Sequence, residues 1–266
     1  MDNHPPVYKP SLSNTGKYSV YLNYLMEYLK YGDFKSLAAS IRYVSTHKLP
    51  GRDYETSSGM GKFHIRRNTT DFQFINYAYE KSIKDYMLKN IDTFDVFIDA
   101  GACMGEYDIW LAKLGKRCIA IEPVNFATMT KNISLNGLEN KIQTFNCGVG
   151  DKYERVYFEI LENVTSSSHI ERDSSKEPNV TIEKIDDLSK RFNISDTDRI
   201  LMKIDVETME EEVINGSAEF IKSRKDFRII YEDFPEDNLR NDKLLQKITN
   251  FKFDRIDDYN RIATKI

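Results

Sequence analysis

The sequence predicts an α/β fold with a mostly parallel seven-stranded sheet, an antiparallel C-terminal strand and an N-terminal helical extension. From residue 96 onward, short apolar runs alternate with amphipathic stretches, as in parallel strands joined by helices that cover both sheet faces. The last two apolar runs, 251–256 and 260–265, are separated by only a few residues, which requires antiparallel pairing. We therefore predict a helical extension over residues 1–90 and an α/β domain over residues 91–266.

The overall composition is that of an ordinary globular protein, with 40% hydrophobic and 30% charged residues. The formal net charge of −4 gives no global basic field, so we expect no nucleic-acid partner. No apolar run approaches the roughly 18 residues of a membrane-spanning helix, and the N-terminal residues lack the apolar core of a signal peptide. Cys103, Cys118 and Cys147 lack zinc-type spacing, so we interpret them as reduced thiols and expect a cytoplasmic protein.

The N-terminal extension is predicted to be mainly helical. Aromatic and aliphatic residues recur at helical spacing from Gly16 to about His47, with a break near Gly32 and Asp33. Residues 71–90 are predicted to form one further helix, capped near its first residue. Three alternatives account for the many tyrosines here: helical core packing, contact with a second copy in a homodimer, or stacking on the sugar rings of a substrate. These residues are Tyr18, Tyr21, Tyr24, Tyr28, Tyr31 and Tyr43.

The elements of the α/β domain follow one another in a regular order, interrupted by an antiparallel-looking insert at 154–160 and 179–184. The predicted strands of the sheet are 96–100, 117–122, 142–147, 200–206, 227–232, 251–256 and 260–265, and the predicted helices are 106–114, 125–136, 209–223 and 239–249.

The loop after the first of these strands carries an acid and two glycines, in the order Asp99, Gly101, Ala102 and Gly105. Dinucleotide sites use G-x-G-x-x-G, which brings the backbone close to a pyrophosphate. Here the spacing is G-x-x-x-G, and the Asp99 carboxylate would repel a pyrophosphate at short range. The same carboxylate suits a ligand with an ammonium and a sulfonium group and no phosphate. We therefore predict that these four residues bind S-adenosylmethionine, with a dinucleotide as the alternative.

An acid also ends the second strand, 21 residues after Gly101 in the sequence, at Glu122-Pro123. In nucleoside sites an acid at about this distance accepts hydrogen bonds from the ribose hydroxyls, and we assign that role to Glu122. We place the adenine ring at the end of the third strand, beside Gly148 and Val149. Asn136, on the helix between these strands, completes the predicted cofactor-binding set.

These segments together resemble the FkbM-type methyltransferases. The resemblance rests on the D-x-G-A-x-x-G loop at 99–105, the E-P pair at 122–123, N-x-x-x-N-G at 132–137 and K-I-D-V-E at 203–207. It covers about residues 62–234, and Thr208 stands where the family usually has glycine. The resemblance implies a Rossmann-like class I methyltransferase fold and transfer of a methyl group from S-adenosylmethionine, most often to a hydroxyl oxygen.

Three charged residues alternate along the fourth strand, so Lys203, Asp205 and Glu207 are predicted to point the same way. A lysine in an apolar strand needs an acidic partner, for which Asp205, Asp99 and Glu232 are the candidates. The set is either a structural ion pair or a catalytic group in which Asp205 orients or deprotonates the acceptor hydroxyl. Asp205 is also assigned to the cofactor site. His169, after three serines in the insert, is the second candidate base.

No metal is predicted, because the acids Asp205, Glu207, Glu232 and Asp233 lack a tight metal-binding spacing. We therefore expect an O-methyltransferase that acts on a small-molecule or glycan acceptor, with a sugar or glycan precursor as first choice. The alternatives are a lipid or polyketide-like acceptor, or a cofactor-binding module that regulates a partner without turnover. We also expect that no segment of the chain spans a membrane, and we consider a homodimer as the assembly.

Overall fold

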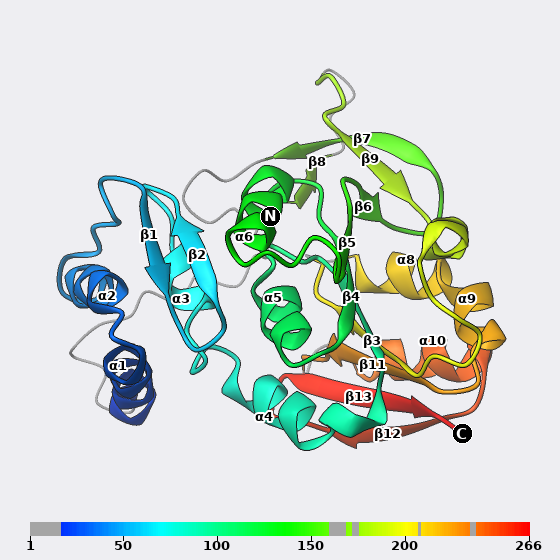
Figure 1. Cartoon of the computed structure of the whole chain (residues 1–266). Helices are drawn as coiled ribbons and strands as arrows, with labels where there is room; N and C mark the ends of the chain where they lie inside the picture. The colour runs from blue at the N-terminus through cyan, green and yellow to red at the C-terminus, as the bar shows by residue number, and fades with distance from the viewer. Residues whose placement is uncertain (1–16, 160–168, 172–175, 207–208, 235–237) are drawn as a thin grey trace. The chain divides into compact units, whose positions relative to one another are not determined.

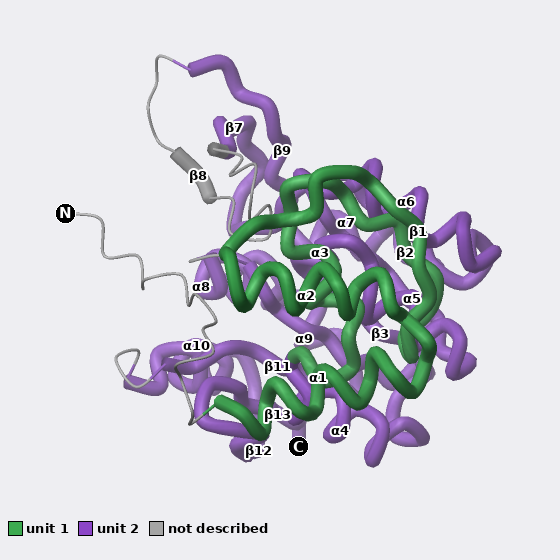
Figure 2. The backbone as a smooth tube through the Cα atoms, turned by 90° about the vertical axis from the view of Figure 1, so that its left-hand side faces the viewer, with its two compact units in different colours: residues 1–79 green, residues 80–266 purple. Residues whose placement is uncertain are grey.

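The computed structural model describes the chain except for residues 1–16, 160–168, 172–175, 207–208 and 235–237, and at 159 and 169–171 it describes the backbone alone. The chain divides into two compact units, Met1–Tyr79 and Glu80–Ile266 (Figure 2). The division precedes helix α4 (Lys81–Lys89), whereas the predicted boundary at residue 90 follows it. No helix in the described part of the chain has the length and apolarity needed to cross a bilayer.

The first unit packs two helices with a β-hairpin and a short helix. Asp33 caps α2 by accepting a hydrogen bond from the Ser36 amide at 3.0 Å, and it also accepts one from the Thr56 hydroxyl. The buried Tyr28 donates its hydroxyl to the Phe72 carbonyl at 2.9 Å, so at least this tyrosine serves helical packing. The elements are α1 (Tyr18–Tyr31), α2 (Phe34–Thr46), β1 (Tyr54–Ser57), β2 (Lys62–Ile65) and α3 (Asp71–Phe74).

The second unit is built on a seven-stranded sheet in the order β12-β13-β11-β10-β3-β4-β5 (Figure 1). The pairs among β11, β10, β3, β4 and β5 are parallel, and β13 pairs antiparallel with both β11 and β12. The predicted fold class is therefore confirmed. The strands are β3 (Val96–Ala100), β4 (Arg117–Ile121), β5 (Ile142–Phe145), β10 (Ile200–Ile204), β11 (Phe227–Glu232), β12 (Phe251–Arg255) and β13 (Asn260–Lys265).

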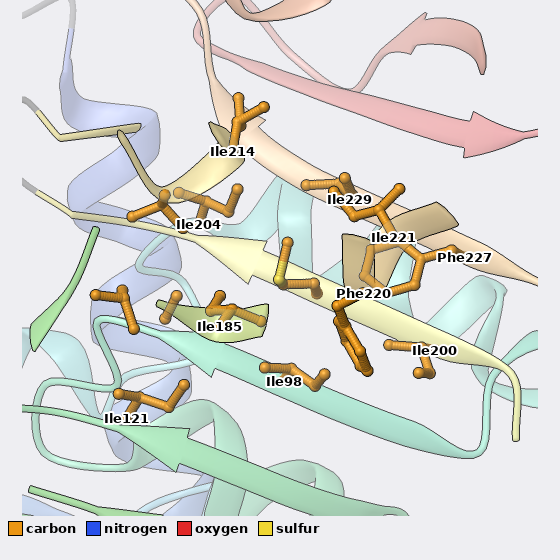
Figure 3. Close-up of a cluster of buried hydrophobic side chains, with 14 of the residues drawn as sticks. Ile98, Ile121, Ile185, Ile200, Ile204, Ile214, Phe220, Ile221, Phe227 and Ile229 are labelled. Carbon is orange, nitrogen blue, oxygen red and sulfur yellow. The ribbon is translucent and has the colours of Figure 1, made fainter. Parts of the chain in front are cut away.

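One face of this sheet carries the main hydrophobic core, shown in Figure 3. Ile98, Ile200 and Ile229 project from neighbouring strands onto Ile214 and Phe220 of the covering helices. Burial on both faces explains why these strands are nearly continuous apolar runs. The helices on this face are α7 (Ile185–Leu188), α8 (Glu210–Asn215), α9 (Ala218–Ser223) and α10 (Arg240–Ile248).

The opposite face is covered by α4 and α5 (Glu106–Lys113), and α6 (Phe126–Leu135) packs beside the loop that precedes α5. The Tyr107 ring of α5 lies 6.4 Å from the Phe97 ring of β3, and the Cys118 thiol of β4 donates to the Asp108 carbonyl. Alternation along β3, β10 and β11 directs Asp99, Lys203 and Glu232 to this same face.

The insert after β5 forms a second, smaller sheet in the order β6-β9-β7-β8. β7 pairs antiparallel with β9, as predicted. It also pairs antiparallel with β8, a strand that was not predicted, while β6 pairs parallel with β9. The strands are β6 (Gly148–Val149), β7 (Glu154–Glu159), β8 (His169–Glu171) and β9 (Val180–Glu183), and short 3-10 turns occupy Ile91–Thr93 and Ser189–Arg191.

Two predicted helices are each divided in the structure. Residues 71–90 form α3 and α4 rather than one helix. α3 ends at Phe74, turns follow, and Glu80 adopts the left-handed conformation at φ 46° directly before α4. Residues 209–223 form α8 and α9, separated at Gly216. A Cβ at Gly216 would lie 1.9 Å from the Gly150 carbonyl oxygen, and the Gly216 carbonyl accepts from the Asp186 amide. The spacing of apolar residues therefore did not predict either helix break, because both depend on backbone conformation or on contacts with distant residues.

Candidate active site

The loop between β3 and α5 is held close to the ends of the neighbouring strands. The amides of Gly101 and Ala102 both donate to the Ile121 carbonyl of β4, at 3.0 and 3.1 Å. Gly101 has φ +96°, and a Cβ there would lie 1.9 Å from the Asp205 carbonyl oxygen after β10. Gly105, at φ +79°, begins α5. The first glycine is thus required both by its backbone conformation and by the approach of the next strand.

Glu122, at the tip of β4, is 5% exposed, and its carboxylate binds three backbone amides. It accepts from Cys103 at 3.0 Å and from Val124 and Asn125 at 2.7 Å each. These three bonds hold the carboxylate in one orientation at the strand tip, where the ribose contact is predicted. The predicted ribose ligand therefore also fixes the glycine-containing loop.

The two asparagines of α6 lie in different places. Asn132 is fully buried and donates its side-chain amide to the Met104 carbonyl at 3.0 Å, which ties α6 to the loop. Asn136 is the residue after the last turn of α6, and its side-chain amide caps the Asn132 carbonyl at 2.8 Å. Because α6 begins just after β4, its end lies about 15 Å along the helix from that strand tip. This position gives Asn136 a helix-capping contact and weighs against the predicted cofactor contact, which stays a prediction.

The predicted adenine side of the site brings two segments together. A Cβ at Gly148 would lie 3.9 Å from Cγ of Pro123, so the start of β6 adjoins the tip of β4. The side chain of Val149 is buried in the main core. Only the backbone of Val149 is thus available to a ligand.

Lys203 and Asp205 form an ion pair at the end of β10. The lysine side chain is 6% exposed and the aspartate side chain 40%, so the pair reaches from the interior to the surface. Lys203 is also the register partner of Asp99 on β3. Asp205 thus supplies the acidic partner expected for this lysine. Burial lowers and the Asp205 charge raises the pKa of Lys203, and the net shift is upward.

Further charged groups surround this pair, and the sequence analysis did not identify them as site residues. Tyr107 donates its hydroxyl to Glu80 at 2.7 Å, and its ring lies 5.1 Å from the Lys203 ammonium nitrogen and 4.9 Å from that of Lys84. Glu106 belongs to the same set, because it interacts electrostatically with Lys84 and Lys203. Lys84 lies on the buried face of an amphipathic helix, and that position was the available sequence signal.

Burial dominates the electrostatics of the carboxyl groups here. Burial raises the pKa of Asp99 to about 7, and the neighbouring Asp205 contributes in the same direction. Burial likewise raises the pKa of Glu106 to about 8 and that of Glu232 to about 8. Burial lowers the pKa of Lys84 to about 8. The site therefore holds several groups that exchange protons near neutral pH.

Two predicted catalytic residues cannot be placed at the site. Glu207 lies outside the described residues, and for His169 the structure describes the backbone, in β8, but not the side chain. Within the described ranges, no group of three or more His, Cys, Asp or Glu side chains is arranged to hold a metal ion.

The sheet order and the acid-glycine loop define a Rossmann-like class I methyltransferase that uses S-adenosylmethionine. Residues 99–260 match the family described as the methyltransferase FkbM domain, and the chain belongs to this family. The residues present fit the cofactor. Asp99 is a buried acid before the loop, and its Oδ1 has no hydrogen-bond partner among the described residues. Gly101 has no side chain that could block a ligand, and the acid Glu122 directly follows β4.

The chain is also similar to several solved structures. It is 14% identical to the METTL16 methyltransferase domain, covering 71% of this chain and 66% of that chain with a TM-score of 0.42. It is 14% identical to precorrin-6y C5,15-methyltransferase from Geobacter metallireducens GS-15, covering 69% of this chain and 87% of that chain with a TM-score of 0.40. It is 9% identical to the SAM-dependent methyltransferase from Agrobacterium tumefaciens, covering 82% of this chain and 71% of that chain with a TM-score of 0.47. A comparison with curated protein sequences finds no match.

Proposed function

We propose that this methyltransferase acts on a hydroxyl oxygen, with a sugar or glycan precursor as acceptor. The observation that carries the proposal is the Lys203–Asp205 pair, in which a partly exposed carboxylate is held at the end of β10 beside the Gly101 loop. The Lys203 ammonium holds the Asp205 carboxylate in place, and a carboxylate is a strong acceptor for a hydroxyl donor. Asp205 would therefore orient the hydroxyl of the acceptor.

The cofactor, when bound, would supply a methyl group to the acceptor oxygen, and its sulfur, neutral after the transfer, would be the leaving group. The chain contributes position and proton acceptance, because the geometry of the two reactants supplies much of the acceleration in such a displacement. A base within hydrogen-bond reach of the hydroxyl adds about 10²–10⁴-fold. Asp205 is the predicted base. Glu232, whose pKa burial raises to about 8, is a second candidate next to it.

For the cofactor contacts, we propose that Asp99 receives the ammonium group and Glu122 the ribose hydroxyls. The backbone of Gly101, Ala102 and Gly105 would line the donor side. Pro123, Gly148 and the Val149 backbone would flank the adenine. These assignments follow from the chemistry of each group and from the adjacency of the loop, the β4 tip and β6.

The test is methyl transfer from radiolabelled S-adenosylmethionine to a panel of sugars, glycans, lipids and polyketide-like alcohols. We expect turnover with a sugar hydroxyl, and in Asp205→Ala we expect loss of turnover, by about 10²-fold or more, with cofactor binding retained. Glu219→Gln, a change at an exposed acid of α9, is the control. Turnover with a lipid or polyketide-like alcohol alone would replace the sugar assignment. Cofactor binding without turnover on any acceptor would favour a regulatory cofactor-binding module.

A further inference from the structure

Six carboxyl groups and only two ammonium groups gather on the α4–α5 side of the sheet, at the end where the glycine loop lies. We call this set the carboxyl cluster. Its acids come from five places in the second unit, and electrostatic interactions link every member to others of the set. The members are Glu80 before α4, Asp99 on β3, Glu106 and Asp108 on α5, Asp205 after β10 and Glu232 on β11, with Lys84 on α4 and Lys203 on β10.

Among the residues that the structure describes, several buried oxygens of the cluster have no hydrogen-bond partner. These are Oδ1 of Asp99, Oε2 of Glu106 and both carboxylate oxygens of Asp108, and the three residues are 2%, 6% and 0% exposed. The three carboxyl groups also interact electrostatically, and burial raises the pKa of Asp108 well above its usual range. Buried carboxyl groups without donors that lie near one another favour the protonated form.

The cluster cannot be fully ionised. Asp99, Glu106 and Asp108 are buried together with Lys84 and Lys203, whereas Asp205, Glu80 and Glu232 are partly exposed. Full ionisation would therefore leave one excess negative charge away from water, with three further carboxylates beside it, a cost that buried groups avoid by binding protons. On the other face, Glu210 at the start of α8 interacts with Glu232 and adds negative charge. The Tyr107 ring lies near both lysines and adds no charge to the count. In the free protein, therefore, protons neutralise part of the cluster.

A cation bound at the glycine loop would take over this neutralising role. S-adenosylmethionine carries an ammonium and a sulfonium charge, whereas its product S-adenosylhomocysteine has the same ammonium and carboxylate but a neutral sulfur. The two molecules therefore differ by one positive charge at the reacting atom. A nearby positive charge favours the ionised form of a carboxyl group.

We propose that the carboxyl cluster distinguishes the methyl donor from its product by charge, because donor binding expels protons from the cluster that product binding leaves in place. Glu232, at the strand end next to Asp205, is the group we assign to the sulfonium-dependent part, and Asp99 is common to both ligands. Each expelled proton passes to the solvent buffer, and no other bond changes. This inference rests on the donor site of the proposed function but needs no methyl acceptor.

The test is isothermal titration of the full chain with each ligand at pH 7.0, in buffers of different ionisation enthalpy. At this pH the ligands' own ammonium groups, which titrate at about 7.7–8.0, stay mostly protonated. We expect the donor to release about 0.5–1 proton more than the product. One proton corresponds to a tenfold change in affinity per pH unit, so the donor-to-product affinity ratio should rise roughly three- to tenfold between pH 6.0 and 7.0.

Glu232→Gln should remove at least half of the donor–product difference in released protons, whereas Glu219→Gln, at an exposed acid of α9, should leave that difference unchanged. Equal proton release by the two ligands in the wild-type protein overturns the proposal, whether or not either variant folds. Full release in a folded Glu232→Gln variant overturns the assignment to Glu232. Proton release without O-methyl transfer on any acceptor would contradict the proposed function and leave this inference standing.

Discussion

The carboxylate of Glu122 accepts a hydrogen bond from the Cys103 backbone amide at 3.0 Å, so the tip of β4 holds the loop that follows β3. Cys103 itself has φ +47°, an unfavourable conformation for a residue with a Cβ, and this bond helps to maintain it. The two halves of the candidate cofactor site are therefore one hydrogen-bonded unit. A change at the ribose end is expected to reach the donor end.

Glu122→Ala should weaken S-adenosylmethionine binding by at least about 1 kcal/mol, because buried donors lose a charged partner. It should also lower the free energy of unfolding by about 1–3 kcal/mol, since three amides lose their acceptor. Titration calorimetry and urea denaturation measure the two effects. Unchanged affinity in a folded variant would refute the ribose assignment.

Asn132→Ala and Asn136→Ala form a matched pair on one helix. Asn132 holds the Met104 carbonyl of the loop, so its loss should cost about 1–3 kcal/mol of stability and reduce cofactor affinity. Asn136 caps the Asn132 carbonyl at the end of α6, so its loss should cost about 1 kcal/mol or less and leave affinity unchanged. Thermal denaturation and ligand titration of both variants are the measurement. A larger affinity loss in Asn136→Ala would restore that residue to the cofactor site.

Gly101→Ala and Gly115→Ala separate backbone strain from steric conflict. The two glycines have nearly the same φ, +96° and +94°, but a Cβ at Gly115 meets open space, whereas one at Gly101 meets the Asp205 carbonyl at 1.9 Å. We expect about 1 kcal/mol of destabilisation in Gly115→Ala and about 3 kcal/mol or more, with loss of cofactor binding, in Gly101→Ala. Equal effects in urea denaturation would show that the Asp205 carbonyl does not constrain the loop.

The free energy of unfolding of the ligand-free protein should fall as pH rises from about 5 to about 8. Burial raises the pKa of Glu106 and that of Glu232 from 4.5 to about 8, so in this window the folded state binds protons that the unfolded state has lost. Stability present below pH 4.5 is thus lost as pH rises through 8, by about 1–4 kcal/mol. Above pH 8 the lowered pKa of Lys84 acts in the opposite direction.

Urea denaturation at several pH values measures this dependence, and saturating S-adenosylmethionine should reduce it by replacing protons with ligand charge. Glu106→Gln should flatten the curve between pH 5 and 8, while Glu219→Gln should not. A stability that is constant or rising over this window in the wild-type protein would contradict the ionisation behaviour assigned to the cluster.

Most of the α/β domain could be predicted from the sequence because its signals are local. Apolar runs bounded by turn residues gave strands such as 227–232 with the observed bounds, and the short link between the last two strands required antiparallel pairing. The helix over 209–223 was predicted as one element because its break depends on the Gly150 carbonyl, a residue far away in the sequence. Glu80, which divides the predicted helix 71–90, likewise has no turn-forming residue type to mark it.

The sequence by itself determined the order of the elements, the acid-glycine loop and the strand-end residues Glu122, Lys203 and Asp205, because each of these features is a local sequence pattern. Only the tertiary structure decided which of these groups meet. Glu106 and Asp108 of α5 interact with Asp99, and Lys84 of α4 interacts with Glu106, because both helices pack on the same face of the sheet. Their ionisation depends on burial away from water, a property of the packed chain that residue type and spacing do not encode.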